Sequence, residues 1–356
     1  MRVIFSGGGT LGSVTPLLAV SEALSEKEPG SEFLWVGTAD GPERETVERY
    51  SLGFRAIASG RLRRFWTWSN LLTPFLVLKG LFDALSLLRK WKPDVVVSAG
   101  GFVAVPVVWA AWLLRIPAHI HQMDWRPGLA NRLAAPFSRS VSVVFEKSAS
   151  DFPRKKVKVT GNPVRREILN GDASVARERF GLEIGTPVVL VLGGGTGALN
   201  LNLLAADAAP EICRRAQILH LTGKGKHDGL PAVLGRYRRS DFFGEEMGHA
   251  FAAADLVVTR AGMGTLTELA ALGKPAVAVP IPGSHQEENA RFFADNGAAM
   301  YFDESTGGAA LAEAVDGLLA DSERLARMSE AARAIGGRDA AQAVADMISE
   351  LAARRT

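Results

Sequence analysis

The sequence predicts an α/β protein with two similar lobes, each built around a parallel sheet. Two glycine-rich turns, at residues 6–12 and 192–197, each follow a short apolar run and precede a helix-compatible stretch. Such a turn lets the backbone approach an anion, and the helix that follows directs its positive end at the same place. Two of these turns, each opening a series of strands and helices, predict two lobes that face one ligand-binding cleft.

Apolar runs alternate with helical patterns through the first half of the chain. Fully apolar strands separated by helices are typical of a parallel sheet that is covered on both faces. Helices are expected between most of the strands, for example over residues 16–26 and 126–135. The strands expected in this first lobe are 3–5, 32–36, 55–58, 95–97, 118–121, 142–145 and 158–160.

A second series of strands begins after the motif Gly161-Asn162-Pro163-Val164-Arg165 interrupts the first. We therefore expect a first domain over residues 1–162 and a second over residues 163–335. Residues 336–356 are expected to form a helix that packs back toward the first domain. The second lobe is expected to contain strands beginning at 188, at 217–221, 256–259, 276–280 and 299–302, an edge element near Phe242 and Phe243, and a helical pattern from 309 to 356.

Composition limits the class of protein. The chain has 356 residues, of which 47% are hydrophobic, enough for two buried cores. Cys213 is its one cysteine and its six histidines lack metal-ligand spacing, so we expect neither disulfides nor a structural zinc site, and a reducing cytoplasm is the natural compartment. The chain leads from Met1 directly into a strand, which predicts no signal peptide.

One uncharged span, residues 95–114, is long enough to cross a bilayer. Two glycines, Gly100 and Gly101, and then Pro106 interrupt it where a strand, a turn and a helix would need them. We therefore interpret the span as a buried strand followed by a packed helix over residues 107–114, and not as a membrane span.

Basic residues are clustered although the formal net charge is only +3. No nucleic-acid-binding motif accompanies the clusters, so nucleic acid is not an expected partner and an anionic membrane surface is the better interpretation. Residues 61–79 combine arginines with aromatic and aliphatic side chains, as an element lying in the lipid headgroup layer does. The alternative is an amphipathic helix packed on its own domain. The residues expected to contact the membrane are Phe65, Trp66, Trp68, Leu72 and Phe75.

The most specific pattern of the second lobe lies just after the strand at 256–259. There Thr265 stands at a helix start, where free N–H groups suit a diphosphate. Glu268, one turn further, can accept hydrogen bonds from both hydroxyls of a ribose; its alternative role is to complement the helix dipole. After the next strand, Gln286 and Asn289 share a helical face, and their amides suit the hydroxyls of a sugar. As isolated amides they would instead be solvated or capping residues.

These motifs belong to a longer resemblance. The chain resembles the MurG family, bacterial glycosyltransferases that add N-acetylglucosamine to the undecaprenyl-diphosphate-linked muramyl pentapeptide of the cell wall. The resemblance implies the two-domain GT-B fold, with UDP-N-acetylglucosamine in the C-terminal half and the lipid-linked acceptor in the N-terminal half. It also implies a peripheral position on the cytoplasmic face of the plasma membrane. The segments that carry it are 8–16, 100–106, 121–131, 161–165, 193–202, 259–269 and 280–290.

The resemblance further implies roles for individual residues. The donor residues are Arg165, Phe243 and Gly244 near the uracil, Gly195, Thr196 and Thr265 at the diphosphate, Glu268 at the ribose, and His285, Gln286 and Asn289 at the sugar, with the backbone of Met263 and Gly264 beside it. The residues of the acceptor and its diphosphate are Gly9, Thr10, Leu11, Gly12, Asp124 and Asn131.

The chain departs from the family pattern at the expected catalytic base. Ser13 stands where the family carries a histidine, and the run His121-Gln122-Met123-Asp124 replaces the usual His-Glu-Gln-Asn. A serine with an ordinary pKa needs a partner base to take a proton from a sugar hydroxyl. We hypothesise that Asp124 is the base and Ser13 positions the hydroxyl, or that His121 is the base. The alternatives are that Asp124 caps the helix beginning near Pro127 and that His121 is structural.

The expected reaction is an inverting single displacement, in which UDP leaves with its charge stabilised by helix N-termini and the glycine turn. No cofactor is expected to be required, and no Asp-x-Asp motif is present, although a loosely bound Mg²⁺ on the diphosphate is compatible with the pattern. Competing functions are another GT-B enzyme with a different glycolipid acceptor, a UDP-sugar 2-epimerase, and a non-catalytic scaffold that binds UDP-sugar.

Overall fold

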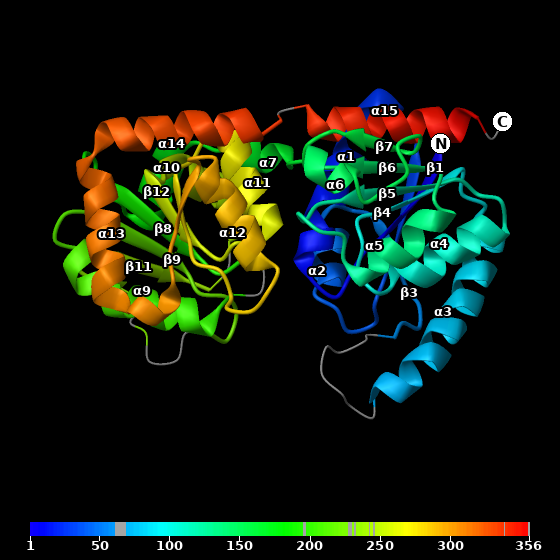
Figure 1. Cartoon of the computed structure of the whole chain (residues 1–356), viewed down its shortest axis with the longest axis horizontal. Coiled ribbons are helices and arrows are strands. Elements are labelled where there is room, and N and C mark those ends of the chain that lie inside the picture. Colours follow the sequence, from blue (N-terminus) through cyan, green and yellow to red (C-terminus); the bar gives the residue numbers. More distant parts are fainter. Residues whose placement is uncertain are drawn as a thin grey trace. The chain divides into compact units, whose positions relative to one another are not determined.

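The computed structural model describes residues 1–60, 69–194, 197–226, 230, 233–241, 243–244, 246–337 and 339–354. These residues form two compact units (Figure 1). The N-terminal unit comprises residues 1–165 together with 338–356, and the C-terminal unit comprises residues 166–337. The chain passes from the N-terminal to the C-terminal unit after residue 165 and returns after residue 337, so its last helix belongs to the N-terminal unit.

The N-terminal unit is built on a seven-stranded sheet in which every pairing is parallel. The strands, in spatial order, are β3 (Gly53–Ala56), β2 (Glu32–Gly37), β1 (Arg2–Ser6), β4 (Val95–Ser98), β5 (Ala118–Gln122), β6 (Ser140–Val143) and β7 (Val157–Val159). Its central strands β1, β4 and β5 are almost entirely buried, which explains the apolar runs of β1 and β4, whereas β5 also buries two histidines.

Helices cover both faces of this sheet. One face packs against α3 (Ser69–Trp91), α4 (Ala104–Leu113) and α5 (Leu129–Ala134). In the same unit α15 (Ala340–Ala353) packs on α1 (Thr15–Lys27), where Lys27 Nζ lies 2.6 Å from Asp346 Oδ1 (Figure 1). The remaining helical segments are α2 (Glu43–Arg49), α6 (Glu146–Ala149) and the 3-10 turns Leu11–Ser13 and Ala135–Phe137.

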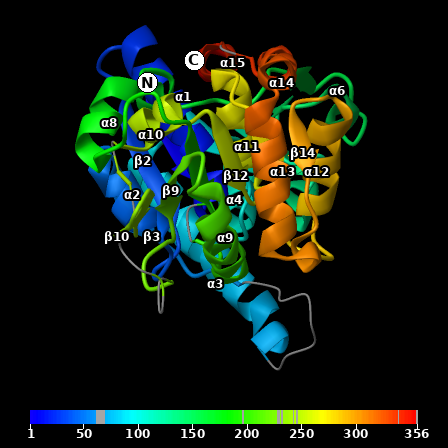
Figure 2. The same cartoon turned by 90° about the vertical axis from the view of Figure 1, so that its left-hand side faces the viewer.

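The C-terminal unit repeats this plan. Its sheet has six strands in parallel pairing and one antiparallel edge strand. One face is covered by α9 and α13 (Figure 2). The strands, in spatial order, are β10 (Val233–Leu234), β11 (Tyr237–Ser240), β9 (Gln217–Leu221), β8 (Val188–Leu192), β12 (Leu256–Thr259), β13 (Ala276–Ala278) and β14 (Ala299–Tyr301). The helices are α7 (Arg166–Leu169), α8 (Ala173–Phe180), α9 (Leu199–Ile212), α10 (Glu246–Ala253), α11 (Met263–Leu272), α12 (Gln286–Asp295), α13 (Gly308–Ala320) and α14 (Ser322–Ile335), with a 3-10 turn at Glu304–Thr306.

Both sheets reverse their strand order next to the first strand, between β1 and β4 and between β8 and β12. This is the Rossmann arrangement, in which ligands bind at the carboxyl ends of the strands beside the reversal. The predicted fold class, two Rossmann-like domains with parallel sheets, is confirmed. The uncharged span 95–114 folds as β4 and α4 inside the N-terminal unit, and within the described ranges no helix is long and apolar enough to span a membrane.

Several predicted elements were displaced. The edge of the second sheet is formed by β11 and β10, whereas the ring of Phe243 is buried 4.7 Å from that of Phe180. The continuous helical pattern from 309 is three helices, because Asp321 starts a new helix by accepting from Arg324 N and Gly336 ends it. The helix expected from residue 126 begins only at Leu129.

Candidate active site

Three loops of the C-terminal unit follow neighbouring parallel strands. The second glycine turn follows β8, residues 260–265 follow β12, and residues 279–285 follow β13. Because carboxyl ends of parallel strands share one edge of a sheet, these loops gather at the same edge. The structure thus brings together, within one unit, motifs that are far apart in sequence.

The loop after β12 leads into the first turn of α11. Gly262 is its N-cap, and Met263, Gly264 and Thr265 form the first turn. The first N–H groups of a helix have no acceptor inside the helix, so the N-terminus of α11 offers donors and a positive dipole end to an anion. Glu268 lies in the following turn and is only 9% exposed, so its carboxylate is not a solvated surface group. The side chain of Met263 is buried in the core of the unit.

The loop after β13 is joined to the loop after β12 by side chains. Asn289 is fully buried and its Nδ2 donates to Ala261 O at 3.1 Å. Its Oδ1 has no hydrogen-bond partner among the described residues. Gln286 Oε1 accepts from Ile281 N at 3.1 Å, and His285 is the exposed N-cap of α12. Gln286 and Asn289 therefore hold the loops in place while lying beside the helix N-terminus.

Arg260 is a second link between these loops. Its guanidinium donates from Nη1 to Val279 O (3.1 Å) and Pro280 O (3.2 Å), and Nη2 lies 2.6 Å from Glu304 Oε2. The arginine is only 5% exposed, so its charge is compensated inside the unit. A charged residue directly after a buried strand is the signal that could have identified this tether.

The second glycine turn rests on a buried polar network. Gly194 and Gly197 have positive φ, and a Cβ at Gly197 would overlap Thr222 O. Lys226 Nζ donates to Gly197 O at 2.9 Å. Asn202 Nδ2 donates to Thr222 O (3.0 Å) and Lys226 O (2.9 Å), which fixes the chain segment against which the turn closes. Gly195 and Thr196, expected at the diphosphate, lie outside the described residues.

His220 extends this network to the edge of the sheet. Its Nε2 lies 3.1 Å from Asn202 Oδ1 and its Nδ1 lies 2.7 Å from the Tyr237 hydroxyl. Burial lowers the pKa of His220 to about 4 and raises the pKa of Tyr237 to about 12, so both groups are neutral at physiological pH. A neutral His220 can therefore donate from Nε2 to Asn202 and accept at Nδ1 from Tyr237.

In the N-terminal unit, the corresponding loops follow the neighbouring strands β1, β4 and β5. The turns after β1 and β4 are in close contact, since a Cβ at Gly101 would lie 2.6 Å from Gly8 O. A Cβ at Gly12 would lie 4.0 Å from Met123 Cε, which places the β5 loop beside the first glycine turn. Ser13 is buried, and its Oγ donates to Thr10 O at 3.4 Å.

The structure corrects the expectation for Gly9. Its N–H donates to Glu43 Oε2 at 3.2 Å, so this donor is already occupied by a carboxylate of the protein. The positive φ of Gly9 and the nearness of a Cβ at this position to Phe102 Cζ (3.3 Å) show why glycine is required there. Gly9 shapes the turn, and its own N–H is already bonded within the protein.

His121 lies in a buried chain of hydrogen bonds. Asn162 Oδ1 is 3.0 Å from His121 Nε2, so that nitrogen carries the proton and Nδ1 accepts from Ser142 Oγ at 2.8 Å. Ser142 Oγ in turn accepts from His119 Nε2 at 2.9 Å, and His119 Nδ1 accepts from Ser140 Oγ at 2.7 Å. Burial, as the main cause, lowers the pKa of His121 to about 4 and that of His119 to about 3.

This arrangement corrects the hypothesis that His121 is a base for the acceptor. The ring is 0% exposed and both of its nitrogens are engaged, so no substrate hydroxyl has a place beside it. The alternative, that His121 is a structural residue, agrees with this burial and with these hydrogen bonds. Asn131 is also buried, and its Nδ2 donates to Gln122 Oε1 at 2.6 Å, so it connects α5 to the end of β5.

Asp124 lies in the loop between β5 and α5 and is partly exposed. The main chain there is fixed, because Asp124 O accepts from Gln122 Nε2 at 2.8 Å. The capping alternative for Asp124 does not hold, since α5 begins at Leu129 with Gly128 as its N-cap. Asp124 is therefore a carboxylate on a held loop beside the first glycine turn.

Comparison with known proteins identifies the family. Residues 3–143 match the glycosyltransferase family 28 N-terminal domain and residues 188–350 match the C-terminal domain of that family. The chain is 37% identical over 358 aligned residues to UDP-N-acetylglucosamine–N-acetylmuramyl-(pentapeptide) pyrophosphoryl-undecaprenol N-acetylglucosamine transferase 2 of Bacillus anthracis, with 98% of this chain and 99% of that protein covered. The chain belongs to the MurG family of glycosyltransferases. A transferase of the same name, without the number, from Legionella pneumophila is 39% identical over 82% of this chain and 81% of its own length.

Solved structures agree with this family assignment. The crystal structure of Acinetobacter baumannii MurG is 28% identical and superposes with a TM-score of 0.73 over 98% of this chain and 99% of that chain. The GT-B fold expected for this MurG-family chain is thereby confirmed. A UDP-GlcNAc 2-epimerase from Neisseria meningitidis, bound to UDP-GlcNAc, has a TM-score of 0.70 over 98% of this chain and 100% of that chain at 15% identity, which shows a shared fold alone.

The three residues expected near the uracil have contacts within the protein in this MurG-family chain. The side chain of Phe243 is part of the core, and Gly244 N donates to Glu246 Oε2 at 3.1 Å, so the main-chain carbonyl groups of these two residues are the polar groups that these contacts leave. Arg165 is the last residue of the N-terminal unit before the crossing, and its Nη1 lies 3.5 Å from the Tyr50 hydroxyl.

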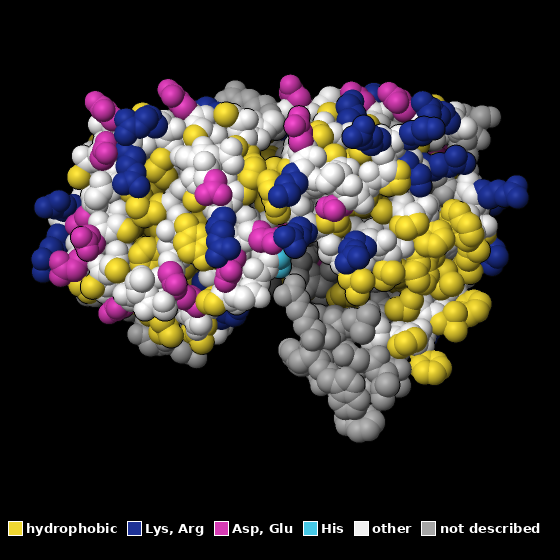
Figure 3. Space-filling view, viewed as in Figure 1, with side chains coloured by type: hydrophobic (Ala, Val, Ile, Leu, Met, Phe, Trp, Pro, Cys, Tyr) yellow, Lys and Arg dark blue, Asp and Glu magenta, His cyan; other side chains and the backbone are white. Residues whose placement is uncertain are grey.

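The N-terminal unit of this MurG-family chain carries an exposed apolar surface. Figure 3 shows hydrophobic side chains gathered over α3, α4 and α5, with basic residues near them. Phe75, Leu78 and Phe82 form an outward stripe on α3, whereas Ala84 and Leu88 of the same helix face the core. Of the residues expected at a membrane, Phe65, Trp66 and Trp68 lie outside the described residues, as does the side chain of Leu72. The other exposed members of this apolar surface are Leu76, Trp112, Leu113, Leu129 and Leu133.

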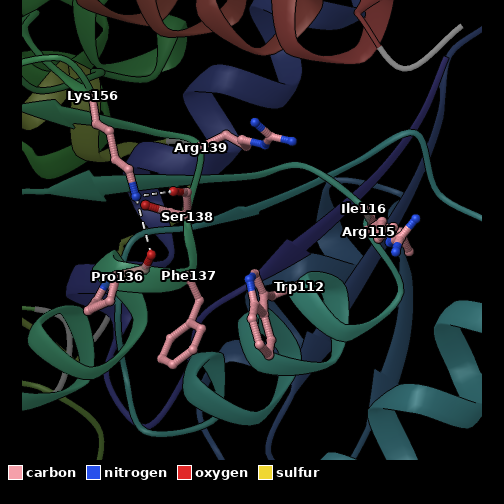
Figure 4. A pocket seen from close by; sticks show the side chains of 8 residues that line it. All are labelled: Trp112, Arg115, Ile116, Pro136, Phe137, Ser138, Arg139 and Lys156. Atoms are coloured by element: carbon pink, nitrogen blue, oxygen red, sulfur yellow. Dashed lines mark hydrogen bonds between the residues drawn. The ribbon is translucent and has the colours of Figure 1, made fainter.

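A pocket of about 410 Å³ opens at the end of α4 (Figure 4). Trp112 and Phe137 form an aromatic wall, with ring centroids 5.1 Å apart in an edge-to-face arrangement. Arg115, Arg139 and Lys156 also line it, and the Lys156 ammonium donates to Pro136 O and Ser138 O. The pocket therefore combines an aromatic wall with cations. Among the residues that the structure describes, no three His, Cys, Asp or Glu side chains gather where they could hold a metal ion.

Proposed function

We propose that this chain transfers N-acetylglucosamine from UDP-N-acetylglucosamine to undecaprenyl-diphosphate-linked N-acetylmuramyl pentapeptide, converting lipid I to lipid II in peptidoglycan biosynthesis. The observation that carries this proposal is the gathering of the three donor motifs after the adjacent strands β8, β12 and β13. End-to-end similarity to transferases of that name supports the same reaction.

The donor is held by the C-terminal unit. The N–H groups of Gly264 and Thr265 at the start of α11 bind the diphosphate, together with the second glycine turn. The Glu268 carboxylate accepts from the two ribose hydroxyls, because it accepts hydrogen bonds without donating any. The uracil is met by Arg165 and by the main chain at Phe243 and Gly244.

The transferred sugar lies beside α12. Gln286, Asn289 and His285 supply both donors and acceptors to its hydroxyls. The buried Asn289 Oδ1, which has no partner among the described residues, supports a ligand at this place, because a buried polar atom normally has a hydrogen bond. The main chain of Gly264 completes the contact.

The acceptor is held by the N-terminal unit. The turn from Thr10 through Gly12 meets its diphosphate at the start of α1, with Asn131 fixing the neighbouring loop. In the transfer step the acceptor hydroxyl oxygen attacks the anomeric carbon of the donor sugar, and the bond from that carbon to the UDP oxygen breaks. The configuration at the anomeric carbon inverts. The hydroxyl proton passes to a base of the protein.

Asp124 is the base in this proposal and Ser13 positions the hydroxyl. A carboxylate can accept the proton, whereas the buried His121 has both ring nitrogens engaged. UDP leaves with its negative charge stabilised by helix N-termini and turn N–H groups. No cofactor is required in this scheme, and a Mg²⁺ ion loosely bound by the diphosphate would assist without a protein ligand set.

The protein works as a peripheral protein on the cytoplasmic face of the plasma membrane, and nucleic acid is not a partner. The outward stripe of Phe75, Leu78 and Phe82 supports contact with a lipid surface, since packing within the unit does not account for it. The cations Arg115 and Arg139, beside Trp112 in the pocket at the end of α4, support an anionic surface.

The proposed function is tested by calorimetry with UDP-N-acetylglucosamine and by UDP release with a short-chain lipid I analogue. Wild-type protein should bind the donor and release UDP only with the acceptor, with or without EDTA. Glu268→Gln should weaken donor binding about tenfold or more, because charged hydrogen bonds to the ribose are lost. Glu313→Gln, on the exposed face of α13, should change nothing. Binding without UDP release would indicate a scaffold, and an epimerised sugar would indicate an epimerase.

A further inference from the structure

Glu43 places a buried carboxylate beneath the first glycine turn. It is the first residue of α2 and is 0% exposed. Its Oε1 accepts from both the main-chain N (2.7 Å) and the Oγ1 (2.6 Å) of Thr38, and its Oε2 accepts from Gly9 N at 3.2 Å. Three donors directed at two oxygens match the acceptor-only hydrogen bonding of a carboxylate.

Two glycines leave the space that this carboxylate fills. A Cβ at Gly8 would overlap Glu43 Oε1, and a Cβ at Gly41 would overlap Glu43 Oε2 and Thr38 Oγ1. Gly8 belongs to the glycine turn itself, whereas Gly41 lies on the loop before α2. The carboxylate is thus enclosed between the turn on one side and the β2–α2 loop on the other, and any displacement of it acts directly on the Gly9 N–H.

We propose that Glu43 is a positioning residue that holds the first glycine turn in the conformation that receives the acceptor. This inference rests on the proposed function of that turn. Glu43 touches no substrate, but it supplies the acceptor for Gly9 N, which would otherwise be a partly buried donor without a partner in the protein or a competing donor to the ligand. The contact with the main-chain N of Thr38 anchors the carboxylate, and the contact with Gly9 transmits its position to the turn.

The two sides of the carboxylate can be separated by substitution. Glu43→Gln keeps the shape of the side chain. Thr38 N and Gly9 N donate to different oxygens of the carboxylate, so the NH2 group of the glutamine must face one of these N–H groups, and that hydrogen bond is lost. Gly41→Ala displaces the carboxylate, because its Cβ would overlap both Glu43 Oε2 and Thr38 Oγ1, while every residue of the turn itself stays as in wild type. Thr38→Val removes only the hydroxyl donor on the far oxygen. Glu45→Gln changes an exposed carboxylate on the same helix and is the matched control.

The experiment compares these four variants with wild type in steady-state kinetics, donor calorimetry and hydrogen exchange of the peptide covering residues 7–13. Glu43→Gln and Gly41→Ala should lower kcat/KM for the lipid I analogue about ten- to a hundredfold, as expected when a partly buried donor loses its partner and the turn loses its support. Both should keep the Kd of UDP-N-acetylglucosamine within about twofold, and both should accelerate exchange in the turn. Thr38→Val and Glu45→Gln should leave the turn and the acceptor kinetics as in wild type.

The inference is overturned if folded Glu43→Gln or Gly41→Ala protein exchanges and reacts as wild type does. It is also overturned if Thr38→Val causes the same losses, since the carboxylate would then act only through general stability. If Glu43→Gln does not fold, Gly41→Ala decides. If the wild-type protein shows no acceptor-dependent UDP release, the proposed function is refuted. The hydrogen-exchange experiment would still show whether Glu43 stabilises the conformation of the turn.

Discussion

The side-chain amide of Asn289 donates a hydrogen bond to the main-chain oxygen of Ala261, 28 residues earlier in the chain. Ala261 precedes the N-terminus of α11, and Asn289 lies on α12. One buried contact therefore fixes the loop before α11 relative to α12. In the proposed function, the groups for the diphosphate and those for the transferred sugar are thereby held as one rigid group.

Removal of this contact should impair donor use more than stability. Asn289→Ala loses both the bond to Ala261 and the amide face offered to the sugar, so kcat/KM for UDP-N-acetylglucosamine should fall about a hundredfold. Asn296→Ala is the matched control, because Asn296 makes the same kind of bond, to Phe292 O, at the exposed end of α12. Equal kinetics for the two variants would contradict a donor role for Asn289.

Asp124→Asn tests the base. The amide keeps the size of the side chain but cannot accept a proton, so kcat should fall about a hundredfold or more while the Kd of the donor is unchanged. The measurement is UDP release under saturating donor and acceptor. Ser13→Ala should cost less, about tenfold, because it removes only an orienting hydroxyl. Unchanged turnover in Asp124→Asn would remove Asp124 from the mechanism.

The support of the second glycine turn predicts a stability effect. Asn202→Ala leaves Thr222 O, Lys226 O and the His220 Nε2 proton without partners inside the C-terminal unit. Unfolding of that unit in urea should require about 3 kcal/mol less free energy. Asn200→Ala, an exposed position on the same helix α9, should stay within about 0.5 kcal/mol of wild type. A similar loss of unfolding free energy in Asn202→Ala and Asn200→Ala would show that the hydrogen bonds of Asn202 do not stabilise the turn.

Acid should destabilise the fold through its buried histidines. Burial lowers the pKa of His119 to about 3 and those of His121 and His220 to about 4. In the unfolded chain these rings take up protons near pH 6.5, so their contribution to the free energy of unfolding is complete only above that pH. It should fall toward pH 4 by up to about 1.4 kcal/mol per pH unit for each histidine.

Urea titrations at about pH 7, 6 and 5 measure this slope. In His220→Gln the free energy of unfolding of the C-terminal unit should fall less steeply with decreasing pH, because one of the contributing histidines is absent. A slope between pH 6.5 and 5 that is identical in this variant and wild type would mean that His220 is not held neutral in the folded unit.

Membrane contact through α3 predicts an effect on vesicle binding. The double variant Phe75→Ser and Phe82→Ser removes two exposed rings from the outward stripe and should weaken binding to vesicles containing anionic phospholipid about tenfold or more. Ile184→Ser is the control, because Ile184 is 92% exposed but lies in the C-terminal unit. Sedimentation with vesicles measures both, and higher salt should weaken the wild-type interaction. Equal weakening by the control would mean that apolar exposure in general, and not this stripe, causes binding.

Sequence patterns were most reliable where a strand is buried on both faces. The strands at 217–221 and 256–259 were predicted with their observed bounds, because both are fully buried and therefore consist mainly of apolar residues. The edge element was expected near Phe242 and Phe243, of which Phe242 lies outside the described residues. The observed edge strands β10 and β11 come earlier in the chain, since an edge strand needs no apolar run, and the buried ring of Phe243 belongs to the core. Helix ends were also displaced, as at Leu129, where no capping side chain marks the start.

By itself, the sequence determined the two lobes, the glycine turns and the donor motifs, because each depends on neighbours along the chain. Only the tertiary structure decided which polar side chains face a ligand and which face the protein. His121 and Gly9 looked available in sequence, but Ser142, Asn162 and Glu43 occupy their hydrogen-bonding groups. Those partners come from other strands and loops, and a hydrogen bond between segments is set by packing distance, which no local pattern encodes.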